Sequence, residues 1–337
     1  MSSTTIPGSA ASEGSLYVIP ATDPEKKRLV TQYALKKRIY GWTSAVPRSV
    51  NVSSLSNVLD VAAGTCVWTI DFTNIPEVRA RLKVNDHHNT THTNPVRLYA
   101  CDIETKFFPD KNLIDQLGIT TFQHDVTKPF PADMLGKFDI VQISFLLLCL
   151  TEQGWTNALA NCRQVLKPDG ILMLNEADPV LYSTDFPPPP EDAPSHDLTA
   201  SLSIQGWLGN ANRIYAAFSV ENGFIPDLTF RLPGMLAAAG FSIIDTHRAA
   251  APSGKLCRTI AGGDLAEFEE FSVENLEFIF EHFAAVLMAK GKLQTPDGKK
   301  VTTQEALDAM VAEVKEGIRS EGALSLGRYI VARKDGE

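Results

Sequence analysis

The sequence predicts an α/β fold, a doubly wound and mostly parallel β-sheet with helices on both of its faces. Short apolar segments that suit buried strands alternate with helical segments over residues 57–176. Small residues follow the first of these strands, and acidic or polar residues follow the later ones. Because right-handed crossovers bring the carboxyl ends of such strands to one edge of the sheet, we expect a ligand site there.

The composition is that of an ordinary globular protein. The chain has 337 residues, of which 44% are hydrophobic and 21% are charged. That length allows one large α/β domain with additions, or two domains. Its 31 basic and 40 acidic residues give a net charge of −9, and the basic residues form no long cluster. This balance argues against nucleic acid as a partner, because binding to a phosphate backbone needs a positive surface.

The cysteines and the apolar segments predict a cytoplasmic protein that does not bind to a membrane. The five cysteines are scattered, form no CxxC pair and are odd in number, as expected in a reducing compartment. The first residues lack the basic-then-apolar order of a signal peptide. The longest apolar run, residues 143–150, is far too short to cross a bilayer.

A polar insert over residues 83–95 contains His87, His88 and His92, which invite a metal interpretation. Asn, Thr and Pro surround these histidines, and no carboxylate or cysteine cluster completes a ligand set. We therefore interpret the insert as a solvated loop and expect no metal site.

Residues 1–22 are small and polar and are expected to form a flexible tail. A helix is predicted within residues 23–50, where an Asp-Pro pair supplies its start and apolar residues share part of one face. Two interpretations stay open. It is a surface helix of the main domain, or it is a cap in which Gln32 and Tyr33 help to close the ligand site.

The first strand, residues 57–61, ends in the small residues Ala62, Ala63 and Gly64, after which a helix is predicted from Val67. Small side chains at such a turn let the backbone approach a ligand, and the helix start offers unpaired N–H groups. This pattern is typical of a mononucleotide site. An ordinary tight turn is the alternative, because Ala62 and Cys66 stand where a glycine-rich fingerprint has glycine.

Acidic residues end the next two strands. Residues 96–101 form the second predicted strand, and Asp102 follows it at the place where a carboxylate accepts hydrogen bonds from ribose hydroxyls. The alternative role of Asp102 is a helix N-cap. The third strand, residues 120–123, ends in His124-Asp125-Val126, where Asp125 can accept the exocyclic amine of adenine and Val126 can pack on the ring.

The fourth and fifth strands complete this edge. Residues 138–144 are apolar enough for a central strand and end in Ser144. A helix over 156–166 is stopped by the turn Lys167-Pro-Asp-Gly170, and the strand over 171–175 then ends in Glu176.

The alternation stops after Glu176, and the remainder is expected to build a cap and the last two strands. We predict helices over 198–222, 231–240, 265–290 and 303–319, and strands over 241–244 and 327–333. The expected parts after residue 22 are a cap helix (23–50), a cofactor-binding core (51–177), a substrate cap (178–228), a core helix and strand (229–250), a helical cap insertion (251–324) and a final strand (325–334).

These motifs resemble those of class I S-adenosylmethionine-dependent methyltransferases. The first motif is Val-Leu-Asp-Val-Ala-Ala-Gly-Thr-Cys at 58–66, and the most specific is Val-Leu-Lys-Pro-Asp-Gly-Ile-Leu-Met-Leu at 165–174. The runs at 66–72 and 103–109 are similar to fungal secondary-metabolism methyltransferases related to a global regulator. The chain departs from that group at Cys66 (usually Gly), at Tyr33 (often His) and in the longer 83–95 insert.

The resemblance implies a Rossmann-like, seven-stranded sheet with an added helical cap, and S-adenosyl-L-methionine as cofactor, released as S-adenosyl-L-homocysteine. The implied reaction is in-line transfer of a methyl group to O or N of a small, largely apolar acceptor, with aromatic faces near the sulfonium (Phe145, and Tyr33 or Trp68). Cys66 would add a side chain near the methionine moiety. The expected cofactor-binding residues are Tyr33, Asp60, Ala62, Ala63, Gly64, Cys66, Asp102, Ile103, His124, Asp125, Val126, Ser144 and Phe145.

No general base is evident in the sequence. His196, His247 and His282 are isolated, and His282, on a predicted cap helix, is the catalytic candidate. Exposed aromatic residues on that helix would permit a homodimer. Two alternative functions remain, a binding or regulatory protein with this fold and an enzyme that uses the bound cofactor for a rearrangement or cyclisation.

Overall fold

The computed structural model describes residues 21–82 and 95–336. The expected tail lies almost entirely outside these ranges, as does the insert with His87, His88 and His92. Within them, no helix is both long enough and apolar enough to cross a membrane.

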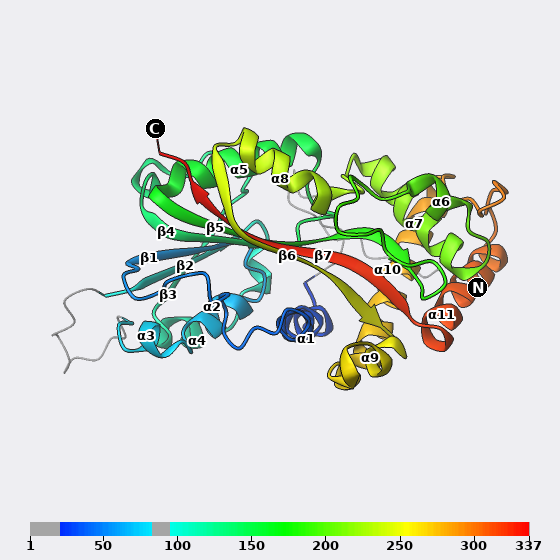
Figure 1. Cartoon of the computed structure of the whole chain (residues 1–337), viewed down its shortest axis with the longest axis horizontal. Helices are drawn as coiled ribbons and strands as arrows, with labels where there is room; N and C mark the ends of the chain where they lie inside the picture. Colours follow the sequence, from blue (N-terminus) through cyan, green and yellow to red (C-terminus); the bar gives the residue numbers. More distant parts are fainter. Residues whose placement is uncertain (1–20, 83–94, 337) are drawn as a thin grey trace, which may run out of the picture.

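A seven-stranded sheet forms the centre of the described chain, in the order β3-β2-β1-β4-β5-β7-β6 (Figure 1). The first five strands pair in parallel, and β7 pairs antiparallel with both β5 and β6. This confirms the predicted mostly parallel, Rossmann-like sheet. The strands are β1 (Asn57–Val61), β2 (Arg97–Asp102), β3 (Ile119–Gln123), β4 (Phe138–Ser144), β5 (Leu166–Tyr182), β6 (Phe241–Ser253) and β7 (Ala323–Lys334).

Helices cover both faces of the parallel strands (Figure 1). On one face lie α5 (Glu152–Val165) and α8 (Leu228–Ala238), and on the other lie α2 (Val67–Phe72), α3 (Pro76–Arg79) and α4 (Lys111–Gln116). Each face has its own apolar core, because the central strands are buried on both sides. The N-terminal helix α1 (Asp23–Ile39) lies near the middle of the sheet.

The cap is a separate helical layer at one end of the sheet (Figure 1). Its own core is apolar and includes Phe218 and Phe283, whose rings stack with centroids 3.7 Å apart. Its helices are α6 (Leu198–Ser203), α7 (Trp207–Asn222), α10 (Glu269–Ala289) and α11 (Gln304–Ser320), with α9 (Leu256–Thr259) beside them. Short 3-10 turns, labelled η1 to η4, occupy Thr105–Phe107, Ala132–Met134, Ile260–Gly263 and Ala266–Phe268.

The last three strands are longer than predicted. The strand expected over 171–175 continues to Tyr182, the one expected over 241–244 continues to Ser253, and the last begins at Ala323. The prediction was wrong because the apolar run in the sequence marks only the part of β5 inside the parallel core. Beyond it, antiparallel pairing between β5, β6 and β7 sustains the strands.

The helix predicted over 198–222 is two helices. The chain leaves α6 after Ser203, and Gly206 adopts a φ of +77° before α7 begins. Gly209 then lies so close to Ile204 that a Cβ atom would be 1.8 Å from the Ile204 carbonyl oxygen. A glycine at each point therefore allows the two helices to meet at a sharp break.

The Lys-Pro-Asp-Gly motif is structural. Lys167 Nζ donates to Asp139 Oδ1 at 2.7 Å, and Asp139 Oδ2 accepts from the Asn57 amide at 2.8 Å. These contacts join the amino ends of β1, β4 and β5, away from the edge where the strands carry their polar ends. Asp169 adopts a left-handed φ of 58° within the motif.

We expect Gly317→Ala to lower the free energy of unfolding by about 2–3 kcal/mol, because overpacking a dense core forces side chains out of their minima. A methyl group at Gly317 in α11 would lie 2.0 Å from Trp207 Cγ in α7. Urea denaturation measures the effect. The matched control is Gly234→Ala in α8, which has open space around it and should be neutral or stabilising by up to about 1 kcal/mol. Equal stability of both variants would contradict the packing.

Candidate active site

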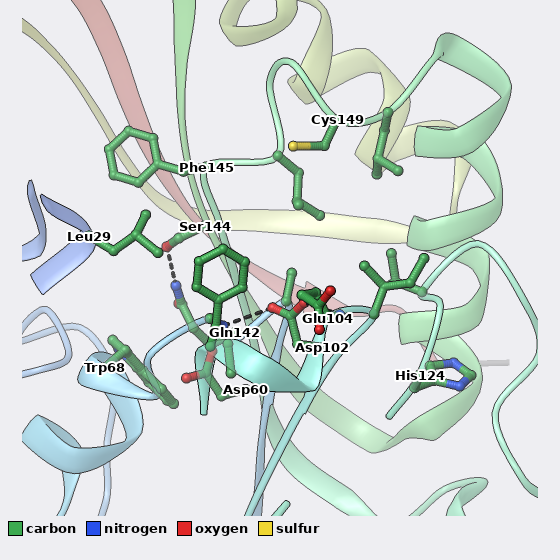
Figure 2. Close-up of a pocket in the computed structure, with 18 of the residues that line it drawn as sticks. Leu29, Asp60, Trp68, Asp102, Glu104, His124, Gln142, Ser144, Phe145 and Cys149 are labelled. Carbon is green, nitrogen blue, oxygen red and sulfur yellow. Dashed lines mark hydrogen bonds between the residues drawn. The ribbon is translucent and has the colours of Figure 1, made fainter. Parts of the chain in front are cut away.

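The principal cavity of the described chain has a volume of about 410 Å³ and lies at the carboxyl edge of the sheet. Figure 2 shows Leu29 of α1 on one side, Asp60 and Trp68 at one end and His124 at the other. Ligands of doubly wound folds bind at this edge. Twelve of the thirteen predicted residues line the cavity, namely Tyr33, Asp60, Ala62, Ala63, Gly64, Asp102, Ile103, His124, Asp125, Val126, Ser144 and Phe145.

The thirteenth residue, Cys66, does not line the cavity. Its side chain is fully buried in the core beneath the turn, together with Trp68 and Phe72. Its backbone adopts φ 53°, and this explains why glycine is usual at the position. The expectation that its side chain stands near the ligand is therefore corrected.

The turn after β1 is wound tightly around left-handed residues. Ala62 has φ 54° and Gly64 has φ 50°. The Ala63 amide donates to the Cys101 carbonyl at 2.9 Å, which fixes the turn to β2. A left-handed alanine costs about 1–2 kcal/mol. This strained turn places the backbone close to the cavity, at a point where a larger side chain would not fit.

Asp102 is held rigidly by two backbone amides. Its Oδ2 accepts from Gly64 N at 2.8 Å, and its Oδ1 accepts from Glu104 N at 2.9 Å. Burial raises the pKa of the Asp102 carboxyl, although both amides oppose that shift. Each oxygen keeps a further lone pair, so the carboxylate can accept two more hydrogen bonds from the cavity.

The far end of the cavity carries the His124–Val126 segment. Asp125 Oδ1 accepts from Thr127 N at 2.9 Å and from Thr127 Oγ1 at 2.7 Å, and these bonds form a local turn. The His124 ring packs on Phe130 with centroids 3.9 Å apart, and burial lowers its pKa. The packed His124 ring and the apolar Val126 make this end of the cavity more suitable for a flat ring of a ligand than for a charged group of a ligand.

Asp60 is a buried acid at the other end. Only 4% of it is exposed, and its Oδ2 accepts from Thr69 Oγ1 at 2.6 Å. Burial raises its pKa to about 7, so near neutral pH it exists in both protonation states. A cation bound beside it would favour the charged form.

Lys36 is a site residue that the sequence reasoning missed. It lies on α1 and lines the cavity, although only 5% of it is exposed. Its Nζ donates to Ser144 Oγ at 2.9 Å and stands 4.2 Å from the centre of the Phe145 ring. Burial lowers the pKa of Lys36, while Glu176 and Asp60 oppose that shift. In the sequence, Lys36 belongs to a run of basic residues that ends in Arg38, and such a run is typical of an exposed helix face.

Gln142 was also missed. It lies in the middle of β4, is 3% exposed, and donates to Ser144 Oγ (Figure 2). A polar side chain inside an apolar central strand is the signal that could have identified it, because buried polar groups need a partner.

Phe145 adopts a conformation that is unusual for an aromatic residue. Its φ is 58°, and its amide donates to the Asn175 carbonyl at 3.1 Å. Such strain costs of order 1–3 kcal/mol and clusters at functional sites. The conformation turns the chain out of β4 and presents the ring to the cavity (Figure 2).

A second cavity of about 170 Å³ adjoins the first. Gln32, Lys36 and Phe145 line both cavities. The lining of the second cavity is mostly apolar and comes from α1, α10 and the long strands. Its polar residues include Asn175 and Glu176, at the end of the parallel part of β5.

His282 does not join either site. It lies on α10 but lines neither cavity, and its ring is 6.3 Å from that of Phe283. Burial lowers its pKa. Among residues 21–82 and 95–336, no group of three or more His, Cys, Asp or Glu side chains could hold a metal ion.

Comparison with known proteins finds similarity to methyltransferases. The model of the ubiE/COQ5 methyltransferase family matches residues 35–184. The chain is 26% identical over 228 residues to methyltransferase psoC of Aspergillus fumigatus, which covers 68% of this chain and 70% of that protein. It is 25% identical over 167 residues to methyltransferase grgD of a Penicillium species, which covers 49% of this chain and 53% of that protein.

A solved structure, phosphoethanolamine N-methyltransferase 2 of Haemonchus contortus with S-adenosylmethionine, aligns at a TM-score of 0.41 and 12% identity. The alignment covers 95% of this chain and 54% of the other. The family match, the two fungal relatives and the seven-stranded sheet agree with the motifs in the sequence. The chain is similar to class I S-adenosylmethionine-dependent methyltransferases, fungal ones among them, and this likeness supports S-adenosylmethionine as its cofactor.

Proposed function

We propose that this enzyme methylates O or N of a small, largely apolar acceptor by in-line displacement. The similarity to two fungal methyltransferases and the resemblance seen in the sequence support a role in secondary metabolism. The observation that carries the proposal is the pair of adjoining cavities. Polar residues at the ends of β1, β2 and β4 line the larger cavity, as expected for the cofactor site. The smaller cavity is mostly apolar and shares a wall with the larger one.

The residues of the larger cavity fit the cofactor along its length. Asp102 can accept hydrogen bonds from both ribose hydroxyls, because its two oxygens are fixed side by side. Asp125 and Val126 lie at the adenine end. The turn around Gly64, with its close backbone, suits the methionine end.

When bound, S-adenosylmethionine supplies a methyl group that its sulfonium has already made electrophilic. The protein must orient the acceptor and exclude water. Phe145 and the helix α1, through Gln32 and Lys36, form the wall between the two cavities and can align one ligand against the other. Asp60 favours a cation by its charge, and the Phe145 ring does so by its π face.

Asp102→Ala should weaken binding of S-adenosylmethionine by about 30- to 100-fold, because the loss of charge-assisted hydrogen bonds costs about 2–3 kcal/mol. Isothermal titration calorimetry measures the affinity. Asp115→Ala serves as the control, since Asp115 is exposed and pairs with Lys111 across one turn of α4. Unchanged affinity in Asp102→Ala would contradict the cofactor placement.

The preference for S-adenosylmethionine over S-adenosylhomocysteine should rise between pH 6 and pH 8. Asp60, with a pKa of about 7, is mostly neutral at pH 6 and mostly charged at pH 8. Only the first ligand carries the sulfonium charge, so its affinity alone gains from that ionisation. A gain of up to about tenfold corresponds to one pKa unit. Calorimetry at both pH values tests this, and Asp60→Asn should flatten the dependence. A preference that falls with pH would refute it.

Methyl transfer itself is tested with labelled S-adenosylmethionine and a panel of phenols and amines. We expect a labelled methylated product from at least one apolar phenol or amine. Tight cofactor binding without transfer to any member of the panel would instead favour a binding or regulatory protein.

A further inference from the structure

The smaller cavity contains two buried polar atoms without a partner. Glu176 is 0% exposed and Asn175 is 3% exposed, and both line this cavity. Among the described residues, neither Glu176 Oε2 nor Asn175 Nδ2 has a hydrogen-bond partner. An unsatisfied buried polar group costs of order 1–3 kcal/mol, so an acceptor and a donor without partners in the lining of one cavity indicate a ligand that completes them.

The Glu176 carboxylate is fixed in place by its other oxygen. The Leu146 amide donates to Glu176 Oε1 at 3.0 Å, just past the strained Phe145. Oε2 is therefore the oxygen available to a ligand. Lys36, on the shared wall, attracts the carboxylate electrostatically. Burial raises the pKa of Glu176 to about 8, so its carboxylate is a stronger base than that of an exposed glutamate and is mostly ionised only above that pH.

We propose that the smaller cavity binds the acceptor, that the acceptor is an apolar compound with an acidic hydroxyl, a phenol or an enol, and that Glu176 Oε2 removes the proton of that hydroxyl. This inference rests on the proposed function and adds the substrate class and the base. Asn175 Nδ2 donates a hydrogen bond to the acceptor, and Lys36 stabilises the negative charge that develops on its oxygen.

Proton removal and methyl transfer proceed as follows. The O–H bond of the acceptor breaks, and its proton passes to the Glu176 carboxylate. The freed oxygen electron pair forms the bond to the methyl carbon, while the carbon–sulfur bond breaks and its electron pair returns to sulfur. The products are the methyl ether, S-adenosylhomocysteine and a protonated Glu176, which loses its proton to solvent before the next turnover.

The surroundings favour a hydroxyl over an amine. An amine acceptor enters mainly as an ammonium ion, which has no lone pair with which to accept a hydrogen bond from Asn175 Nδ2. A neutral hydroxyl can donate to Glu176 and accept from Asn175 at the same time. The remaining lining includes Leu35, Ile39 and Leu276, which suit an apolar ring or chain.

The test compares two probes of equal size on the protein saturated with S-adenosylhomocysteine. 1-Naphthol carries the hydroxyl, and 1-methylnaphthalene replaces it with a methyl group. We expect wild type to bind 1-naphthol at least about tenfold more tightly, because a site built for a hydroxyl rejects the analogue without it. Equal binding of the two probes, or binding of neither, overturns the acceptor-site assignment. Failure of S-adenosylhomocysteine itself to bind would instead refute the proposed function.

Glu176→Gln isolates the role of the free oxygen. The Leu146 amide requires an acceptor at the Oε1 position, so the glutamine NH₂ must take the place of Oε2 and present a donor. The preference for 1-naphthol should fall to about threefold or less, with affinity for S-adenosylhomocysteine kept. Glu267→Gln is the matched control, since Glu267 is exposed and pairs with Arg38 at the surface. A preference kept in Glu176→Gln overturns the proposal.

Catalysis gives the second measurement. On the phenol that the labelled-cofactor panel identifies, kcat of Glu176→Gln should fall by about 100-fold or more, the usual contribution of a general base. A kcat within threefold of wild type would refute Glu176 as the proton acceptor. Transfer to amines with no transfer to any phenol would refute the substrate class.

Discussion

The antiparallel pairing of β5, β7 and β6 is the constraint on which the arrangement of the molecule depends. These strands extend between the parallel core, where Leu174 and Ile330 are buried, and the cap, where Leu181 and Ala323 are buried. Antiparallel pairing along these strands, with register shifts at Ala177/Leu181 and Ile243/Asp245, therefore fixes the cap helices relative to the cofactor edge. The two cavities can share a wall because the two cores share these strands.

The site is built from backbone that is held in costly conformations. Ala62, Cys66 and Phe145 all have positive φ without being glycine. The surrounding hydrogen bonds compensate for this strain, as Asp102 does for the first turn and the Asn175 carbonyl does for Phe145. The result is a preorganised edge, which needs little rearrangement to receive a ligand.

The sequence predicted the strands and site residues that follow from a local pattern. It could not predict the site residues that are brought together by contacts between distant parts of the chain. The parallel strands and the cofactor edge follow from apolar runs that end in small or acidic residues such as Gly64 and Asp102. Lys36 was missed because a lysine on a charged helix looks exposed until Ser144 and Phe145 are known to lie beside it. The smaller cavity was missed for the same reason, since its lining comes from α1, β5 and α10. His282 was considered only for its residue type.

The pairing of β5 with β7 also determines which fragments of this chain would leave a strand edge uncovered. The segment that matches the family, residues 35–184, begins within α1 and ends just after β5. Such a fragment would lack β7, which pairs with β5 from Ile171 to Tyr182. A long apolar strand would then become a free edge, open to pairing with other chains. We therefore expect a fragment of residues 35–184 to aggregate more readily than the whole chain, since the last strand covers this edge.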